Sequence, residues 1–274
     1  MSLAAKLPWI HRHAGGFPGI GSQSLPTDSD CLTYLAAVAA ADGAGVEVGV
    51  ATAVDTFFSR IKADGLFEAI KASCILCGAR TLTGALVPMV GTAPTNLPVA
   101  NGFVAGDYSR TAGLKGDGTS YLDSGRANDA DPQDDNHNAI YLTQAYSNGS
   151  TFEIGASVSA GRNMINVAAN VFTRCRDATE INTGISSGSN GLVGFSRNSS
   201  AGYEVRAYGS EHSATAPSDG LASDNVFVFA GNNGGSPIVI SSARLAFYSI
   251  GTSLDLAALD TAVDNLISDI GNAL

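Results

Sequence analysis

The apolar residues of the first hundred positions recur with the spacing of helices. Between residues 46 and 63 they lie three or four residues apart, which is typical of an amphipathic helix, and Asp64–Gly65 supplies a stop signal. Further elements are predicted in this part of the chain: a helix over residues 31–42 with its N-cap among Thr27, Asp28 and Ser29, a short helix over 66–72, and buried strand or loop at 74–77 and 81–87.

From residue 99 onward the apolar pattern changes to period two and is interrupted by turn residues. Strands are predicted at residue 114 with 121–122, and at 139–146, 151–158, 166–175, 192–197, 203–208, 226–230 and 238–249. Turns are predicted at residues 116–118, 148–149, 188–190 and 231–235. Strands that recur about every twelve residues indicate an antiparallel sandwich rather than a sheet of parallel strands joined by helices.

The segment 253–274 returns to helical spacing. One stripe is apolar: Leu256, Leu259, Val263, Leu266, Ile267, Ile270 and Leu274. Four aspartates lie on the other side: Asp255, Asp260, Asp264 and Asp269. Ser253 is predicted as the N-cap, and Asp255 suits the positive end of the helix. The stripe is expected to pack either on the sandwich or against copies of itself.

These patterns predict a mainly β protein, an antiparallel β-sandwich with a small N-terminal helical region and a C-terminal amphipathic helix. Three segments are expected: an N-terminal arm at 1–45, a small helical or linker region at 46–98, and the sandwich at 99–274, which ends in the helix 253–274. The 274 residues are enough to bury a sizeable core.

The composition of the chain argues against nucleic-acid binding and membrane insertion. The chain carries a formal net charge of −10 and its basic residues are scattered, whereas nucleic-acid binding requires a basic patch. The longest apolar run, residues 34–41, is far shorter than the ~20 residues that span a bilayer, so no membrane insertion is expected. The first residues lack the apolar core of a secretory signal, so the protein is expected to be made and assembled in the cytosol.

Four cysteines occur in the chain, at positions 31, 74, 77 and 175. Cys74 and Cys77 have the C-x-x-C spacing, but a zinc site needs a second pair of ligands and a redox motif needs a thioredoxin-like context. Ile75 and Leu76 lie between the two thiols and indicate an apolar, buried segment. The cysteines are therefore predicted to be buried and structural.

The most polar segment, residues 123–138, suggests a cation. Its candidate ligands are four carboxylates: Asp129, Asp131, Asp134 and Asp135. Calcium prefers six to eight oxygen ligands, and acidic loops on sandwich domains can supply them, although this spacing matches no EF-hand. The alternative is a solvated acidic loop that holds no ion. His137 adjoins the loop, but no nucleophile motif accompanies it, so acid–base catalysis is not expected.

Aromatic and amide side chains gather on two neighbouring predicted strands and suggest a glycan-binding patch. The candidate residues are Arg197, Asn198, Tyr203, Arg206 and Tyr208. Aromatic faces and amide groups are suited to sugar binding, but alternating Tyr and Arg residues are also common on strands without any ligand. No catalytic residues are predicted anywhere in the chain.

The first thirty residues hold three prolines and a Gly15–Gly16 pair among few apolar residues. Such a segment cannot build a core of its own, so its order depends on a partner. The candidate assembly anchors to another subunit are its large apolar residues: Trp9, Ile10, Phe17 and Ile20.

Several stretches of the sequence together resemble one family. They are residues 101–126, 128–137, 192–203 and 247–274, joined by 70–82 and 93–96 upstream. These stretches look like bacteriophage virion proteins with a concanavalin A-like (laminin-G-like) jelly-roll domain, which are often tail fibre and other appendage proteins. The resemblance covers about residues 46–274 and leaves out the first 45.

The resemblance implies a jelly-roll sandwich and brings no defined catalytic residues. The calcium ligands of legume-type lectins do not carry over to this sequence residue by residue, so no cofactor is predicted apart from the candidate calcium ion. It implies a non-enzymatic structural protein of the virion, in the tail or its fibres, that presents a lectin-like surface to a host-cell glycan. Other virion proteins and further copies of the chain, with a trimer expected for a fibre, would be its partners. Two alternatives stay open: a cement or decoration protein that binds neighbouring capsid subunits, and a glycan-degrading tail enzyme.

Overall fold

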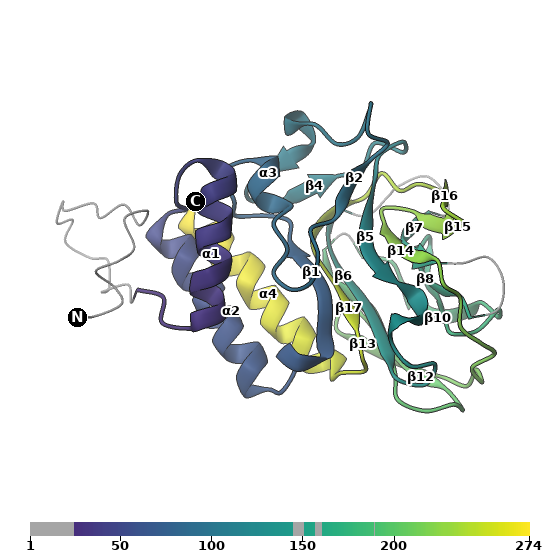
Figure 1. Cartoon of the computed structure of the whole chain (residues 1–274). Coiled ribbons are helices and arrows are strands. Elements are labelled where there is room, and N and C mark those ends of the chain that lie inside the picture. The colour runs from purple at the N-terminus through teal and green to yellow at the C-terminus, as the bar shows by residue number, and fades with distance from the viewer. Residues whose placement is uncertain (1–24, 145–150, 157–160, 189) are drawn as a thin grey trace.

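The computed structural model describes residues 25–144, 151–156, 161–188 and 190–274, and every structural statement below concerns these ranges. Two antiparallel β-sheets pack face to face, and a layer of helices lies on the outer face of one of them (Figure 1). The sequence-based prediction of a mainly β, antiparallel sandwich with a few helices is confirmed.

The first sheet is the one that carries the helices. In the described ranges it has eight strands, in the order β13 (Ser210–Ala214), β12 (Tyr203–Ala207), β11 (Gly191–Arg197), β6 (Asn136–Gln144), β17 (Arg244–Gly251), β4 (Gly113–Lys115) and β3 (Tyr108–Ser109), with β1 (Ile70–Ile75) also paired to β17. Strand β1 thus joins the predicted 46–98 segment to the last strand of the predicted 99–274 segment.

The second sheet closes the other side of the sandwich. Its strands follow the order β10 (Ile181–Ser186), β9 (Asn170–Cys175), β8 (Asn163–Val167), β7 (Phe152–Ala156), β14 (Asn225–Val228), β5 (Tyr121–Ala127) and β2 (Thr95–Leu97). A separate hairpin of β15 (Gly231–Asn233) and β16 (Ser236–Ile238) turns at Gly234 and Gly235, whose φ values of 58° and 88° suit glycine. This hairpin is the turn predicted at residues 231–235.

Strand β6 contributes side chains both to the core between the two sheets and to the core under the helices. Its residues Ile140 and Leu142 point into the sandwich, whereas the alternate residues Ala139 and Tyr141 face the helices. All four are buried, because β6 is covered on both faces. A strand in this position has a continuous apolar run instead of an apolar–polar alternation.

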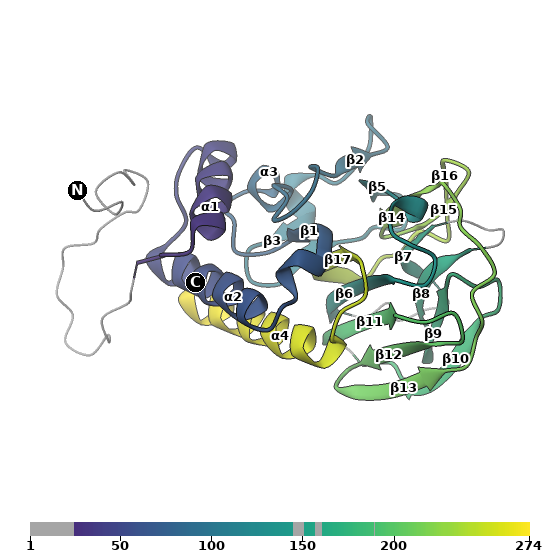
Figure 2. The same ribbon diagram turned by 60° about the horizontal axis from the view of Figure 1, so that its bottom comes forward.

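Four α-helices are described: α1 (Ser29–Asp42), α2 (Val48–Ala63), the short α3 (Leu82–Ala85) and α4 (Leu256–Ala273). Helix α4 runs beside α2 over the outer face of the first sheet (Figure 2). The predicted apolar stripe of α4 is buried from Leu256 to Ile270, while Leu274 lies beyond the helix and is 43% exposed. The stripe packs within the chain, on the sandwich and on α2.

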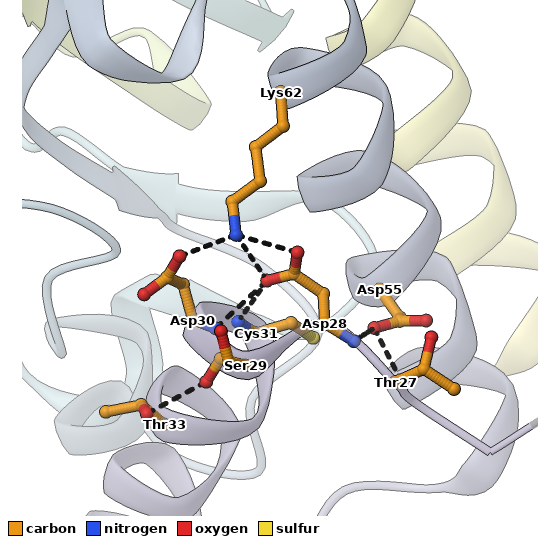
Figure 3. Close-up of polar contacts among 8 residues, drawn as sticks. All are labelled: Thr27, Asp28, Ser29, Asp30, Cys31, Thr33, Asp55 and Lys62. Carbon is orange, nitrogen blue, oxygen red and sulfur yellow. Dashed lines mark hydrogen bonds and ion pairs between the residues drawn. The ribbon is translucent and has the colours of Figure 1, made fainter.

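The start of the helical layer is fixed by a polar cluster that holds α1 against α2 (Figure 3). Asp28, one of the three predicted candidates, is the N-cap of α1, and its carboxylate accepts hydrogen bonds from the amides of Asp30 and Cys31. The Nζ of Lys62 on α2 lies 2.7 Å from both carboxylate oxygens of Asp28. Asp55 of α2 accepts the amides of Thr27 and Asp28. Residues 27–28 are therefore tied to α2 before α1 begins.

Several predicted elements are wrong in detail. The helix expected at residues 66–72 is a single 3-10 turn, Phe67–Ala69, because Ile70 and the residues after it pair with β17. Residues 81–87 contain helix α3 in place of a strand or loop. Residues 166–175 form parts of two strands, with a turn at Ala168–Ala169 that lacks the usual glycine or proline.

The remaining differences concern ends and edges of elements. The N-cap of α4 is Asp255 rather than Ser253: the Asp255 carboxylate accepts the amides of Ala257 and Ala258. The predicted strand 238–249 begins only at Arg244, since Val239 has a φ of +50° that breaks the extended backbone. Strands β10 and β13 were not predicted, because both are polar edge strands without a clear apolar alternation.

All four cysteines are free and buried, as predicted. Cys74 belongs to the core between the sheets and Cys77 to the core under the helices, so the C-x-x-C spacing places the two thiols in different cores. Burial raises the pKa of Cys74 to about 12 and that of Cys77 to about 12. Both side chains therefore act as small apolar residues of the core.

Candidate functional site: a groove between helix α4 and strand β12

Helix α4 crosses the outer face of β11 and β12, and its position there follows from two contacts. Gly194 on β11 leaves room for Leu256: a Cβ at Gly194 would lie 3.1 Å from Cδ2 of Leu256. The amide of Leu254, just before the helix, donates to Oγ of Ser196 at 3.0 Å. The start of α4 is therefore held close to β11, while the helix leaves a gap over β12 and β13.

This gap contains two cavities, of about 310 and 340 Å³, which follow one another along α4. We call them together the α4–β12 groove. Its polar and aromatic lining residues are Asn198, Glu204, Arg206, Glu211 and Asp255 in the first cavity, and Asn190, Tyr208, Asp260, Asp264 and Asn265 in the second. Each cavity has the volume of a small-ligand site.

An ion pair separates the two cavities. Nε of Arg206 lies 2.6 Å from Oδ2 of Asp260, and Nη1 of the same guanidinium lies 2.8 Å from Oε1 of Glu211. The Arg206 and Asp260 side chains are only 16% and 13% exposed, whereas Glu211 is 67% exposed. The guanidinium thus connects β12 to both α4 and β13.

The other carboxylates of the groove are held by neutral donors. Ser213 donates its hydroxyl to Oε2 of Glu204 at 2.7 Å, and Tyr141 donates to Oδ1 of Asp264 at 2.7 Å. Asp255 receives the two backbone amides that it caps. The groove therefore offers carboxylate and amide groups in fixed positions, with acceptors more numerous than donors.

The structure divides the five residues of the predicted glycan patch. Asn198, Arg206 and Tyr208 line the groove. Arg197 and Tyr203 are 0% and 3% exposed and lie inside the sandwich, so they do not belong to any exposed patch. Along β12, residues Tyr203 and Val205 point inward while Arg206 points outward, which is the ordinary alternation of a strand.

Arg197 has a structural role that its sequence position does not reveal. Its guanidinium donates to the carbonyls of Cys175 and Ala216, at 2.6 and 2.8 Å from Nη2, and to the carbonyl of Ser199. The charged group also lies 5.1 Å from the centre of the Tyr203 ring. Backbone carbonyls and an aromatic face together stabilise this buried cation.

Tyr208 lines the second cavity, but its ring packs against the core of the sandwich and its hydroxyl oxygen is buried. Its φ of +50° turns the residue out of the extended β12 backbone. The ring lies against two glycines: a Cβ at Gly188 or Gly191 would be 2.9 or 3.1 Å from Cδ1 of Tyr208. Any larger residue at these positions would displace the ring, so the two glycines leave the room that the ring needs to pack against the core.

The four aspartates of the predicted metal site do not gather around one point. Asp131 is buried and pairs with Arg126, at 2.6 Å from Nη2. Asp134 accepts the hydroxyl of Ser218, Asp135 accepts the amide of Ser253, and Asp129 is exposed. Among the residues that the structure describes, no group of three or more His, Cys, Asp or Glu side chains is arranged to hold a metal ion. The calcium site stays a prediction of the sequence.

Two buried titratable side chains lie outside the groove. His137 is fully buried, with Nδ1 2.5 Å from the carbonyl of Thr252 and Nε2 2.7 Å from Oγ of Ser249. Burial lowers the pKa of His137 to about 4. Glu153 is also fully buried, and burial raises its pKa to about 8 although Thr151, Val167 and Ser241 supply hydrogen bonds that act in the opposite direction. Both side chains are neutral at pH 7 and face no cavity of the groove.

The residues that the sequence did not assign to the site come from α4. Asp255, Asp260 and Asp264 were recognised as its polar side, but nothing in the sequence pairs them with β12, more than forty residues earlier. The predicted assembly anchors Trp9, Ile10, Phe17 and Ile20, and the turn at 148–149, lie outside the described residues.

No family model and no curated protein matches the chain. Among solved structures, the chain is similar to a sialidase from Trypanosoma rangeli, with a TM-score of 0.50 and 10% identity over 81% of this chain and 39% of that one. The NanB sialidase of Streptococcus pneumoniae has a TM-score of 0.37 and 14% identity, over 47% of this chain and 24% of that one. The carbohydrate-binding module CBM40 of a Ruminococcus gnavus sialidase has a TM-score of 0.36 and 12% identity, over 51% of this chain and 84% of that one.

The chain therefore spans about a quarter of the NanB chain and 39% of the T. rangeli chain. At such identities a likeness shows fold and not activity. In the described ranges, no helix is both long enough and apolar enough to cross a membrane. The comparison with the T. rangeli sialidase is consistent with a jelly-roll-like β-sandwich. The polar groove between the first sheet and helix α4 is a feature of this structure.

Proposed function

We propose that the chain is a non-enzymatic structural protein of a bacteriophage virion, located in the tail or its fibres, and that it presents the α4–β12 groove to a glycan on the host surface. The resemblance of residues 46–274 to virion appendage proteins supports the first part. The groove supports the second part and is the observation that carries the proposal.

A hydroxyl-rich ligand fits the chemistry of this groove. The amides of Asn198, Asn190 and Asn265 can both donate and accept, and the carboxylates accept from hydroxyl groups. An apolar ligand would leave these polar groups without partners, which is costly, so a sugar is favoured over a lipid or a drug-like ligand.

Copies of the chain in a symmetric oligomer would strengthen such a contact. A single small groove gives weak binding, and several copies on one particle convert weak contacts into high avidity. The proposal therefore includes a homo-oligomer, with a trimer as the expected state, joined to other virion proteins through the N-terminal arm.

Glycan binding by the purified full chain is the direct test. The chain would be screened on an array of bacterial surface glycans, and the variants Asn198→Ala and Asn265→Ala are expected to weaken binding at least fivefold. Asn272→Ala is the matched control, because Asn272 lies on α4 outside the groove. Loss of binding in the control as well, or no binding by any form, would contradict the glycan site.

Copy number tests the position in the virion. Mass spectrometry of purified particles against the major capsid protein should give a few to a few dozen copies for a tail protein. Hundreds of copies would instead indicate the capsid decoration protein that the sequence left as an alternative.

One observation favours a second candidate, a glycan-degrading enzyme: Glu204, Glu211 and Asp255 line the same cavity. Glycoside hydrolysis uses two carboxylates on opposite sides of the bond. Here each carboxylate already has a structural hydrogen bond, from Ser213, Arg206 or the first turn of α4. Release of reducing ends from a bound glycan, abolished by Glu204→Gln, would establish the enzyme and overturn the non-enzymatic proposal.

A further inference from the structure

The α4–β12 groove has a strongly unequal balance of charge. Among the described residues, five carboxylates and one cationic side chain, that of Arg206, line the groove. The carboxylates come from three elements, β12, β13 and α4, and the residues are Glu204, Glu211, Asp255, Asp260 and Asp264. The imbalance is thus a property of the cavity and not of one acidic loop.

The guanidinium of Arg206 is already paired with carboxylates of the chain. Arg206 bonds to Asp260 through Nε at 2.6 Å and to Glu211 through Nη1 at 2.8 Å. Its charge is therefore shared between two carboxylates of the chain itself. An anionic ligand that approached Arg206 would meet these two carboxylates beside the guanidinium.

The positive end of α4 also holds a carboxylate of the chain itself. Helix N-termini attract anions through their free amides. In α4 the amides of Ala257 and Ala258 are taken by the Asp255 carboxylate, and the amide of Leu254 is taken by Ser196. The first turn therefore adds a carboxylate to the groove instead of free donors.

Three carboxylates keep their negative charge towards the groove. Glu204, Asp255 and Asp264 are exposed, and their hydrogen-bond partners, Ser213, the backbone amides and Tyr141, are all neutral. A neutral donor satisfies an oxygen atom but does not cancel the charge. The groove thus presents a negative potential to a ligand.

From this balance we infer that the groove selects a glycan with a protonated amine, an amino sugar without its acetyl group, and discriminates against carboxylated or sulfated glycans. This inference rests on the proposed function, since it names the ligand class of the same groove. An ammonium group would bond to the carboxylates of Glu204, Asp255 or Asp264, while the ring hydroxyls would bond to the side-chain amides of asparagines that line the groove.

Titration with matched oligosaccharides tests the inference. The purified full chain would be titrated with a glucosamine oligomer, with the N-acetylglucosamine oligomer of the same length, and with sialyllactose, in low salt. The glucosamine oligomer is expected to bind at least tenfold more tightly than its acetylated counterpart, and the difference should shrink in 0.5 M salt because screening weakens ion pairs. Sialyllactose is expected to bind most weakly.

Variants locate the effect. Glu204→Gln and Asp264→Asn keep an acceptor for Ser213 and Tyr141 but remove the charge, and each should reduce binding of the glucosamine oligomer at least threefold. Asp269→Asn is the matched control, because Asp269 is an exposed aspartate of α4 outside the groove.

The outcomes separate the inference from the proposal on which it rests. Equal binding of the acetylated and free amines, or tighter binding of sialyllactose, would overturn the inference and leave a glycan-binding groove. Failure of every glycan on the array and in the titrations would overturn both.

Discussion

Arg206 on β12 and Asp260 on α4 form an ion pair, with Nε 2.6 Å from Oδ2, that lies between the two cavities of the α4–β12 groove. The two residues are 54 positions apart in the sequence. The pair fixes the middle of α4 above the sheet, as Gly194 and Leu256 fix its start. The shape of the groove therefore depends on contacts that also stabilise the fold.

Loss of the Arg206 side chain should weaken both stability and groove geometry. Arg206→Leu leaves Asp260 half-buried without its cation, and we expect the free energy of unfolding to fall by about 1–2 kcal/mol, between the values for exposed and buried pairs. Urea denaturation measures this change. The control is Arg60→Leu, which breaks the exposed Arg60–Asp64 pair and should cost less than about 0.5 kcal/mol. Equal losses in the two variants would contradict the structural role of Arg206.

Gly194 should tolerate no side chain. In Gly194→Ala the new Cβ would lie 2.9 Å from Cβ of Ala139 and 3.1 Å from Cδ2 of Leu256, so α4 or the strand must shift. We expect a loss of about 1–3 kcal/mol, typical of overpacking. The control Gly271→Ala lies in α4 with open space around it and should raise stability by up to about 1 kcal/mol. A neutral Gly194→Ala, measured by thermal or urea denaturation, would show that α4 is not closely held there.

Glu153 should make the protein less stable as the pH rises. Burial raises the pKa of Glu153 from 4.5 to about 8, so between these values the folded state holds a proton that the unfolded state has released. Its contribution to the free energy of unfolding therefore falls as the pH rises from 4.5 to 8, by roughly 5 kcal/mol in all. Urea denaturation of wild type and Glu153→Gln across this range measures the contribution as a difference. A difference that does not change with pH would mean that Glu153 is ionised in the fold.

His137 should act in the opposite direction at lower pH. Its pKa is lowered from 6.5 to about 4, so between these values the unfolded state binds a proton that the folded state lacks. Its contribution to stability is complete above pH 6.5 and is lost as the pH falls towards 4, by about 3 kcal/mol.

The effects of Glu153 and His137 oppose each other between pH 4.5 and 6.5, so the whole-protein curve cannot separate them. An NMR titration of the imidazole reports His137 directly, with His137→Gln used to assign its signal. An imidazole that titrates near pH 6.5 in the folded protein would contradict the buried, neutral state described above.

The helical layer illustrates what the sequence decides locally. The spacing of Val50, Val54 and Phe57 predicted α2, and Asp28 was among the N-cap candidates of α1, because helix periodicity and capping involve residues a few positions apart. The same local signals found most central strands and the β-sandwich class. They failed at Ile70, where the apolar spacing predicted a helix but the residues pair with β17 as a strand. They also failed at the polar edge strands β10 and β13.

The groove shows what only the tertiary structure decided. The sequence named Asn198, Arg206 and Tyr208 together with Arg197 and Tyr203, but the alternation of a strand does not say which face meets solvent. That depends on where α4 packs, and α4 packs through Gly194, Ser196 and Asp260, which are distant in the sequence. The sequence by itself therefore determined the elements and the candidate side chains, while long-range packing determined which of them share a cavity and which are buried as part of the core.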